Sequence, residues 1–440
     1  MILRKRSMNQ RIRTSARPIH FLIAAAIPAV LLQPAAAQDA VDYLVRSTIS
    51  DCANVRAGPD VESERLDCLS PGTRVRVKDS VPYWREIEFG AGNEGWIAKK
   101  LIEIAEPPSE PQEEERWLEI HFIDVGQGDA IWISTPDDDI DGNGVYEGRN
   151  IVIDGGPDSS DDRNAALSYM ETRAHHMAVI DALIVTHPHT DHYRGAESLS
   201  RHFEIAHYYD PGYPSEAVGY NAFLDAMTGD NNEPARAASL HIGENAFGDP
   251  DWGGELDAEF LYSWKDGAAD MGSGNTEVNN SSIVLKLSYG EHSFLFMGDA
   301  EGKDRDDAPA PSKYVEKRLV ETQPDKLKST LLKIGHHGSE TSSTTAFIEA
   351  VDPEIVIVQS GRKPFNHRFL PDETALCRYC AHNPEVEIYR TDENDEAQGL
   401  TSTNDADNDH IVIRSNGTRL EAIPLSSGAP VDRNFCSLHC

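Results

Sequence analysis

Four side chains that often bind metal ions stand within six residues, in the run Thr-His-Pro-His-Thr-Asp-His at positions 186–192. His187 and His189 are two positions apart, so both rings leave the same side of an extended segment. Asp191 and His192 follow where a helix could begin. Imidazole nitrogens and a carboxylate oxygen together suit zinc or a similar divalent ion. The spacing therefore predicts a metal site, and a histidine-rich surface turn is the alternative.

Hydrophobic patterning indicates the elements that position this run. The apolar, β-branched stretch from Asp181 to Thr186 predicts a buried strand that ends at the histidines. From Trp117 onward strands and helices alternate, and many strands with few long helices favour two sheets packed face to face with helices outside. Further strands are expected at residues 281–290, 292–299, 331–338 and 354–359.

The first 37 residues have the pattern of a secretory signal peptide. A basic leader precedes an apolar stretch from Ile19 to Leu32, and small residues stand before Gln38. An uncleaved anchor is the alternative, although the apolar stretch is short and contains Pro28. No later stretch is apolar enough to span a bilayer, so we expect a secreted or periplasmic mature chain.

The chain is strongly acidic. Its formal charge of −34 becomes −40 when the six basic residues of the leader are removed. Such a charge opposes nonspecific binding to nucleic acid, because no basic excess exists to displace counterions. A nucleic-acid substrate held in a local cationic cleft is not excluded.

Six cysteines form an even set in a chain that we expect to reach an oxidising compartment, so disulfides are the default. For the last four, a four-thiolate zinc site is the alternative. The cysteines are Cys52, Cys68, Cys377, Cys380, Cys436 and Cys440.

Residues 38–104 contain short alternating runs separated by Gly and Pro turns, which predicts a small all-β barrel. Asn-Val-Arg-Ala-Gly-Pro at 54–59 and Gly-Trp-Ile at 95–97 resemble a bacterial SH3-like domain. The resemblance implies that Cys52 and Cys68 join neighbouring strands and that the module binds the cell wall or a protein partner. A spacer without a ligand is the alternative. Residues 105–116, rich in Pro and Glu, predict a solvated linker.

Between residues 117 and 425 six further motifs follow one another. Together with His-x-His-x-Asp-His, they resemble the metallo-β-lactamase domain of the ComEC/Rec2 competence proteins. The resemblance implies an α/β fold, an αββα sandwich, in a free-standing exported version, with residues 426–440 as a Cys-containing tail. The motifs are Phe-Ile-Asp-Val-Gly-Gln-Gly-Asp-Ala (122–130), Ile-Asp-Gly-Gly (153–156), Asn-Asn-Ser-Ser (279–282), Met-Gly-Asp (297–299), Lys-x-x-His-His-Gly-Ser (333–339) and Tyr-Arg-Thr-Asp (389–392).

The same resemblance implies two adjacent divalent metal ions. Two histidines would serve the first ion, an Asp-His pair the second, and one aspartate would bridge them. Zinc is expected, with manganese as the alternative, because no histidine in the usual motif supplies a third ligand to the first ion. The implied ligands are His187 and His189, then Asp191 and His192, the bridging Asp299, and His337.

Catalytic, substrate-binding and calcium-binding roles are assigned to one of these ligands and to residues outside the ligand set. Asp191 is also a catalytic candidate, as is His367, which would protonate the leaving oxygen unless it is a packed core residue. The substrate-binding candidates are Asn280, Ser282, His336 and Lys333, where a polar turn and a solvated lysine are the alternatives. Oxygens at alternate positions in Asp137, Asp139 and Asp141 resemble a calcium loop, with an acidic hairpin tip as the alternative.

These assignments predict an exported metal-dependent hydrolase, a phosphodiesterase or nuclease. Two metal ions would clamp a phosphoryl group and a metal-bridging hydroxide would attack it. The partner would be a phosphoester substrate, with DNA as the candidate. Two alternatives stay open: hydrolysis of β-lactams or other esters and amides on the same fold, and a non-catalytic cell-envelope binding protein.

Overall fold

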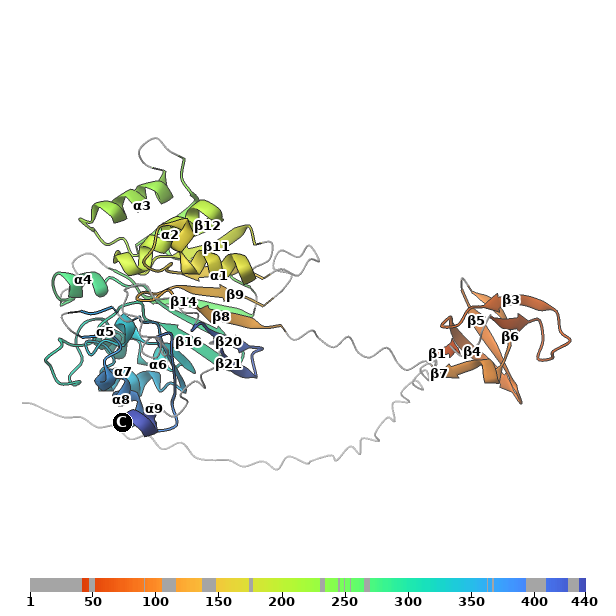
Figure 1. Cartoon of the computed structure of the whole chain (residues 1–440). Helices are drawn as coiled ribbons and strands as arrows, with labels where there is room; N and C mark the ends of the chain where they lie inside the picture. Colours follow the sequence, from red (N-terminus) through yellow and green to blue (C-terminus); the bar gives the residue numbers. More distant parts are fainter. Residues whose placement is uncertain are drawn as a thin grey trace, which may run out of the picture. The chain divides into compact units, whose positions relative to one another are not determined.

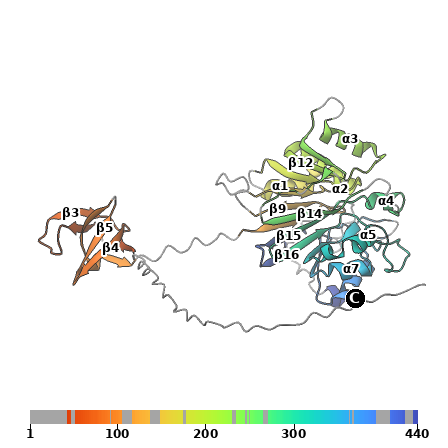
Figure 2. The ribbon, with the colours of Figure 1, turned by 180° about the vertical axis from the view of Figure 1, so that it is seen from behind.

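The computed structural model describes residues 42–46, 52–90, 92–104, 116–136, 148–173, 177–229, 234–243, 246–248, 250–253, 255–264, 270–361, 363–365, 368–392, 409–425 and 435–440. The chain is divided into two compact units, with the boundary between Gln112 and Glu113 (Figures 1 and 2). The predicted signal peptide, most of the predicted linker and residues 426–434 lie outside the described residues.

The described strands of the N-terminal unit form a seven-stranded antiparallel sheet around a small core. Val55, Ile87 and Ile97 are fully buried there, because alternate side chains of short strands face inward. A disulfide joins Cys52 to Cys68 beside the paired strands β2 and β3. The strand order is β3-β2-β6-β5-β4-β1-β7, with bounds β1 (Asp42–Val45), β2 (Ala53–Arg56), β3 (Arg65–Leu69), β4 (Arg74–Val81), β5 (Trp84–Phe89), β6 (Asn93–Ala98) and β7 (Ile102–Ile104); a 3-10 helix, η1 (Lys99–Leu101), precedes β7.

In the C-terminal unit the first sheet is mixed. Strands β10 to β13 pair in parallel, and the strands on the other side of β10 pair antiparallel. Among the described residues it has eight strands, in the order β13-β12-β11-β10-β9-β8-β20-β21. Their bounds are β8 (Leu118–Phe122), β9 (Ile131–Ser134), β10 (Asn150–Ile153), β11 (Val179–Ile184), β12 (Glu204–Asp210), β13 (Ala237–Ile242), β20 (Ile411–Ser415) and β21 (Leu420–Pro424).

The second sheet of this unit contains six described strands, in the order β14-β15-β16-β17-β18-β19. Strands β15 and β16 form the hairpin expected from the sequence, and β16 to β19 run parallel. The bounds are β14 (Leu256–Tyr262), β15 (Val284–Tyr289), β16 (His292–Phe296), β17 (Leu331–Lys333), β18 (Ile355–Val358) and β19 (Glu387–Arg390).

Apolar side chains from the facing sides of the two sheets form one core, which includes Phe122, Ile153, Leu285 and Phe296. Helices cover the outer faces, as Figure 1 shows. On the first sheet these are α1 (Ala165–Arg173), α2 (Thr190–His202) and α3 (Val218–Thr228); on the second they are α5 (Tyr314–Thr322), α6 (Pro324–Leu327), α7 (Thr345–Val351) and α8 (Glu373–His382). The predicted α/β class, an αββα sandwich preceded by a small all-β barrel, is confirmed.

Two disulfides tie the last described helix, α9 (Phe435–His439), to α8. Cys377 pairs with Cys440, and Cys380 pairs with Cys436. The structure therefore forms disulfides at the four C-terminal cysteines in place of the alternative four-thiolate zinc site.

Candidate metal centre

The metal-capable side chains gather where strands end. His187 and His189 follow β11, and α2 begins at Thr190, so Asp191 and His192 lie in its first turn. Asp299 follows β16, and His337 lies in the 3-10 turn η4 (Gly335–Gly338) after β17. Because β16 and β17 are parallel neighbours, their carboxyl ends bring these two residues to one edge of the second sheet.

One cluster of possible ligand atoms comes from His187, His189 and Asp299, all within 4.8 Å of one another. The Nε2 atom of His187 lies 3.0 Å from Nδ1 of His189 and 3.5 Å from Oδ2 of Asp299. His187 is fully buried, whereas His189 is only partly buried. Two imidazole nitrogens and a carboxylate therefore converge, and His189 is the member of the cluster that is partly exposed to solvent.

A second cluster contains Asp129, His192, Asp299 and His337, and all four residues are buried. The Nε2 atom of His192 lies 3.3 Å from Nε2 of His337 and 3.4 Å from Oδ1 of Asp299. The carboxylate of Asp299 belongs to both clusters, in the position from which one residue can contact two ions.

Asp129 takes a place in the second cluster that the sequence assigned to Asp191. The carboxylate of Asp191 lies beside the cluster, with Oδ2 3.5 Å from Nε2 of His337, but it is not among the atoms that converge. Asp129 was missed as a candidate ligand. Its signal in the sequence is an acid at the end of Gly-Gln-Gly, in the loop between β8 and β9.

Buried hydrogen bonds fix the orientation of His192. Its Nδ1 lies 2.8 Å from Oδ2 of Asp154, so Nε2 faces the cluster. Thr186 donates its N–H and its hydroxyl to the same carboxylate, at 2.8 and 2.7 Å. Such a contact fixes the tautomer of a ligand histidine and raises its basicity. On the other ring, Nδ1 of His337 lies 3.0 Å from the carbonyl oxygen of Gln359, which leaves its Nε2 for the cluster.

The helix that carries His192 packs directly on the turn that carries Asp154. The backbone N–H of Gly155 donates to the His192 carbonyl, and that of Gly195 donates to the Gly156 carbonyl, both at 2.8 Å. A Cβ atom on Gly195 would lie 1.6 Å from the carbonyl oxygen of Gly155. Only glycine permits this approach, so the two glycines set the distance between Asp154 and His192.

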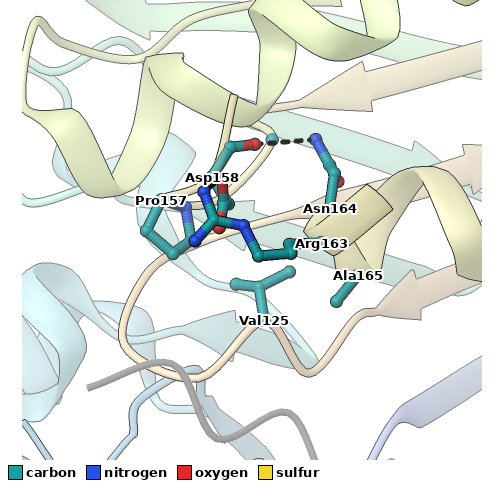
Figure 3. Close-up of a pocket in the computed structure, with 7 residues that line it drawn as sticks. Val125, Pro157, Asp158, Arg163, Asn164 and Ala165 are labelled. Atoms are coloured by element: carbon teal, nitrogen blue, oxygen red, sulfur yellow. Dashed lines mark hydrogen bonds and ion pairs between the residues drawn. The ribbon is translucent and has the colours of Figure 1, made fainter. Parts of the chain in front are cut away.

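Figure 3 shows a small hollow beside this packing, lined by Val125, Pro157, Asp158, Arg163 and Asn164 among others. The amide of Asn164 donates to the carbonyl oxygen of Asp158 at 3.1 Å and to that of Gly195 at 3.0 Å. The cavity measures about 20 Å³, which is room for a single water, and neither metal cluster contributes to its lining. It belongs to the packing of α2 on the turn.

The carboxylates and imidazole rings of the clusters shift one another's pKa values. Burial alone would raise the pKa of Asp299, but His337, His192 and His187 hold it well below its usual range. Burial alone would lower the pKa of His337, but Asp299 and Asp129 raise it to about 10. The Asp299 carboxylate is therefore favoured in its ionised form, next to the positive charge that the His337 ring can carry.

Two observations show that these residues fit divalent ions. The Oδ1 atoms of Asp129 and Asp299 are buried and make no well-aligned hydrogen bond within the described part of the chain, and each faces an imidazole nitrogen: Nδ1 of His337 lies 3.2 Å from the first and Nε2 of His192 lies 3.4 Å from the second. Buried carboxylate oxygens that lack a well-aligned hydrogen bond are costly unless positive charge lies close to them, and a divalent ion would supply that charge. Imidazole and carboxylate ligands are those that zinc and similar ions take.

The substrate-binding candidates occupy different surroundings. Asn280 is buried: its amide donates to the Met271 carbonyl at 3.1 Å and accepts from the N–H of Glu301 at 2.9 Å. The hydroxyl of Ser282 accepts from the N–H of Asp299 at 2.9 Å. Both side chains are buried and hydrogen-bonded to neighbouring protein groups. This does not fit the substrate contact predicted for them.

Lys333 is also fully buried, and its ammonium pairs with Asp129. This contradicts the prediction of a substrate-facing or solvated lysine, because an apolar strand and a buried acid enclose it. His336, by contrast, has a side chain 24% exposed at the edge of the site, with Nδ1 2.9 Å from Oε1 of Glu301. His367, Asp137, Asp139 and Asp141 lie outside the described residues.

His336 and His337 were expected on a strand, where neighbours face opposite sides. Both have left-handed backbone, with φ values of 48° and 52°, in a 3-10 turn. Their rings nevertheless diverge, with centroids 6.2 Å apart, so only His337 joins a cluster.

Within the described ranges, no helix combines the length and the apolar surface that crossing a bilayer requires.

Comparison with known proteins identifies both units. The family model of the metallo-beta-lactamase superfamily matches residues 144–259, and that of the bacterial SH3 domain matches residues 51–103. ComE operon protein 3 of Bacillus subtilis (strain 168) is 27% identical over 290 residues, which are 63% of this chain and 32% of that protein. Recombination protein 2 of Haemophilus influenzae is 24% identical over 248 residues, 56% of this chain and 24% of that protein. The chain thus spans about a third or less of the length of these relatives.

Among solved structures, a long form of RNase Z from yeast is similar with a TM-score of 0.33 and 9% identity, over 72% of this chain and 49% of that one. A likeness this weak supports no inference about activity. The matches to the two family models agree with the αββα sandwich and the antiparallel barrel. The chain therefore carries a bacterial SH3 domain followed in sequence by a metallo-β-lactamase superfamily domain. It is related at modest identity to the ComEC-like competence proteins.

Proposed function

We propose that the chain is an exported hydrolase that cleaves phosphodiester bonds, with DNA as its substrate and two divalent metal ions as cofactors. The observation that carries the proposal is the carboxylate of Asp299, which belongs to two clusters of buried ligand atoms at once. A shared carboxylate is the arrangement expected where two ions act on one phosphoryl group.

His187, His189 and Asp299 would hold one ion, and Asp129, His192, Asp299 and His337 the other. Metal ions in such a pair activate water as a nucleophile and neutralise the charge that develops at phosphorus. The first set offers three ligands, which leaves a position for water or substrate, as hydrolytic zinc sites require. Zinc suits this mixture of nitrogen and oxygen ligands, and manganese is the alternative.

Two residues beside the ligands have chemistry suited to substrate and water. The side chain of Asp191 is 17% exposed, and burial would raise its pKa, but His337 and His192 keep it well below its usual range. The ionised carboxylate can accept a hydrogen bond from the attacking water and orient it. His336 is held by Glu301 at the rim, where a ring nitrogen can donate to a phosphate oxygen.

The choice of DNA rests on the relatives, since competence and recombination appear in the names of proteins that this chain resembles. Export is supported by the three disulfides, which persist in oxidising compartments. N-terminal sequencing of protein recovered outside the cytoplasm should begin at Gln38, and a chain that keeps its first residues inside the cytoplasm would contradict export.

The test of activity compares three substrates. Purified chain loaded with zinc or manganese should hydrolyse bis(p-nitrophenyl) phosphate and single-stranded DNA faster than nitrocefin, and a chelator should stop all turnover. Asp299→Ala should remove activity on both phosphodiesters. Turnover of nitrocefin without cleavage of either phosphodiester would overturn the proposal in favour of β-lactam hydrolysis.

A further inference from the structure

A groove of about 940 Å³ opens in the N-terminal unit, between the end of β1, the β4–β5 turn and the segment from η1 to β7. Two backbone hydrogen bonds hold its walls together. The N–H of Lys99 donates to the carbonyl oxygen of Tyr83 at 2.8 Å, and the N–H of Arg46 donates to that of Leu101 at 2.9 Å. The groove is therefore built by the fold of this unit alone.

The lining is cationic. It contains Arg46, Arg85, Lys99 and Lys100 against a single acid, Glu103. Residues 42–104 as a whole hold nine Lys and Arg against eleven Asp and Glu. The groove thus concentrates positive charge on a module that is close to neutral, in a chain of formal charge −34.

The two lysines are available to a ligand. Both are exposed, and within the described ranges neither makes an ion pair. Arg46 is partly committed, because its Nε donates to the Ile102 carbonyl at 3.2 Å and its Nη1 lies 3.9 Å from Oε2 of Glu103. Arg85 also donates from Nη1, to the carbonyl oxygen of Trp84 at 3.2 Å. A groove that presents ammonium groups without acidic partners is complementary to an anion.

An exposed aromatic ring stands at the edge of the same groove. Tyr83 is 84% exposed, and its φ is 75°, a left-handed conformation that costs energy in a residue other than glycine. Trp84 and Tyr43 also contribute to the lining. A turn that needs left-handed backbone is usually occupied by glycine or asparagine, so an exposed tyrosine at this position is unusual.

We infer that this groove binds single-stranded nucleic acid, with the cations along the phosphates and Tyr83 stacked on a base. The combination of cationic groove and exposed aromatic is the one that single-strand binding uses. Acidic groups of a peptide match the cations and an uncharged glycan matches the ring, whereas single-stranded nucleic acid carries a phosphate and a base at every nucleotide and so matches both. The inference rests on the proposed function, because it supplies the local positive charge that an acidic hydrolase of DNA needs.

Binding is measured by fluorescence anisotropy with fluorescein-labelled oligo(dT) and the full chain. An Asp299→Ala background with chelator present removes the contribution of the metal centre. Lys99→Glu/Lys100→Glu should raise Kd at least tenfold and make the dependence of log K on log salt shallower by roughly 1.4, the value for two lost phosphate contacts on a single strand. Arg65→Glu/Arg76→Glu, an equal charge change at exposed positions outside the lining, should raise Kd less than about threefold.

The ring is tested separately from the charges. Tyr83→Gly suits the φ of 75°, so it should fold, and it should raise Kd about tenfold while the salt slope stays unchanged. Tyr83→Phe keeps a ring and should bind nearly as well as the parent. A circular dichroism spectrum of each variant confirms that the barrel is intact.

Several outcomes would overturn the inference. These are absence of oligonucleotide binding at low salt, equal weakening by the two charge-reversal pairs, or tighter groove-dependent binding of polyglutamate or of anionic vesicles. Hydrolysis of bis(p-nitrophenyl) phosphate by the chain with intact Asp299 separates the two proposals, because this small ester does not need the groove. Hydrolysis without oligonucleotide binding defeats the groove alone, and binding without hydrolysis defeats the proposed function alone.

Discussion

The ammonium group of Lys333 is buried against the carboxylate of Asp129, which precedes it by 204 residues. Lys333 ends β17 in the second sheet, and Asp129 lies in the loop before β9 of the first. The pair therefore joins the two sheets beside the candidate metal centre. Burial alone would raise the pKa of Asp129, but Lys333 and the nearby histidines lower it.

Removal of this lysine charge should destabilise the fold. Lys333→Met leaves the Asp129 carboxylate buried without its cation, so the free energy of unfolding should fall by about 3–5 kcal/mol in the metal-free protein. Lys326→Met is the matched control, because its ion pair with Glu259 is exposed and should contribute less than about 1 kcal/mol. Urea denaturation with chelator present measures both, and equal small losses would show that the buried pair is unimportant.

Metal content should depend on which cluster a ligand serves. Asp299→Ala should lower both equivalents of bound zinc, because its carboxylate belongs to both clusters. His189→Ala should lower only one equivalent, since His189 belongs to the first cluster alone. Elemental analysis after reconstitution with zinc gives the stoichiometry, with the exposed Asp162→Ala as control. An Asp299→Ala protein that keeps a full equivalent would show that the carboxylate is not shared.

The stability of the C-terminal unit should decrease in mild acid because of His410. This ring is 8% exposed, and its Nδ1 accepts a hydrogen bond from the N–H of Asp124 at 3.0 Å, which requires the neutral form. Burial, with Arg173 and His121 nearby, lowers its pKa to about 4. The folded pKa is below the ordinary value of about 6.5, so the contribution is complete above pH 6.5 and lost as the pH falls towards 4, by about 3 kcal/mol.

This prediction is checked by measuring how steeply the free energy of unfolding changes with pH between pH 6.5 and pH 4. His410→Asn keeps an acceptor for the Asp124 N–H but does not titrate, so its slope should be flatter than that of the parent. Parallel slopes for His410→Asn and the parent would exclude His410 as the titrating group.

The disulfide of the N-terminal unit should contribute to that unit alone. Cys52 and Cys68 are 16 residues apart, so Cys52→Ser/Cys68→Ser should lower its stability by about 3 kcal/mol through the entropy of the unfolded chain. Pulse proteolysis across a urea series resolves the fragment that ends near residue 112. Cys377→Ser/Cys440→Ser should leave this fragment's midpoint where it is, and a shift of equal size would contradict the assignment.

The sequence predicted those parts of the site that are local in the chain. The spacing of His187, His189 and His192 is set by one strand end and one helix start, and both lie where the hydrophobic pattern placed them. Asp299 and His337 could be placed only through the resemblance of their motifs to a known family. The structure brings all five residues into the two clusters.

The remainder depends on contacts between distant segments. Nothing near Asp129 reveals that Lys333 will face it, because the two residues meet only when the sheets pack together. A lysine at the end of an apolar strand therefore suggests an exposed edge. Likewise, Asp191 is the acid within the histidine motif, yet the one that converges with His192 comes from another loop. The orientation of a side chain after tertiary packing is not encoded in spacing alone.

If two ions bind as proposed, the shared carboxylate of Asp299 would link the two ion positions thermodynamically. Binding of an ion at either position must change the affinity of the other position for its ion by the same factor. Occupancy of the two positions would then be a joint property, and a substitution near one position would alter the dissociation constant at the other.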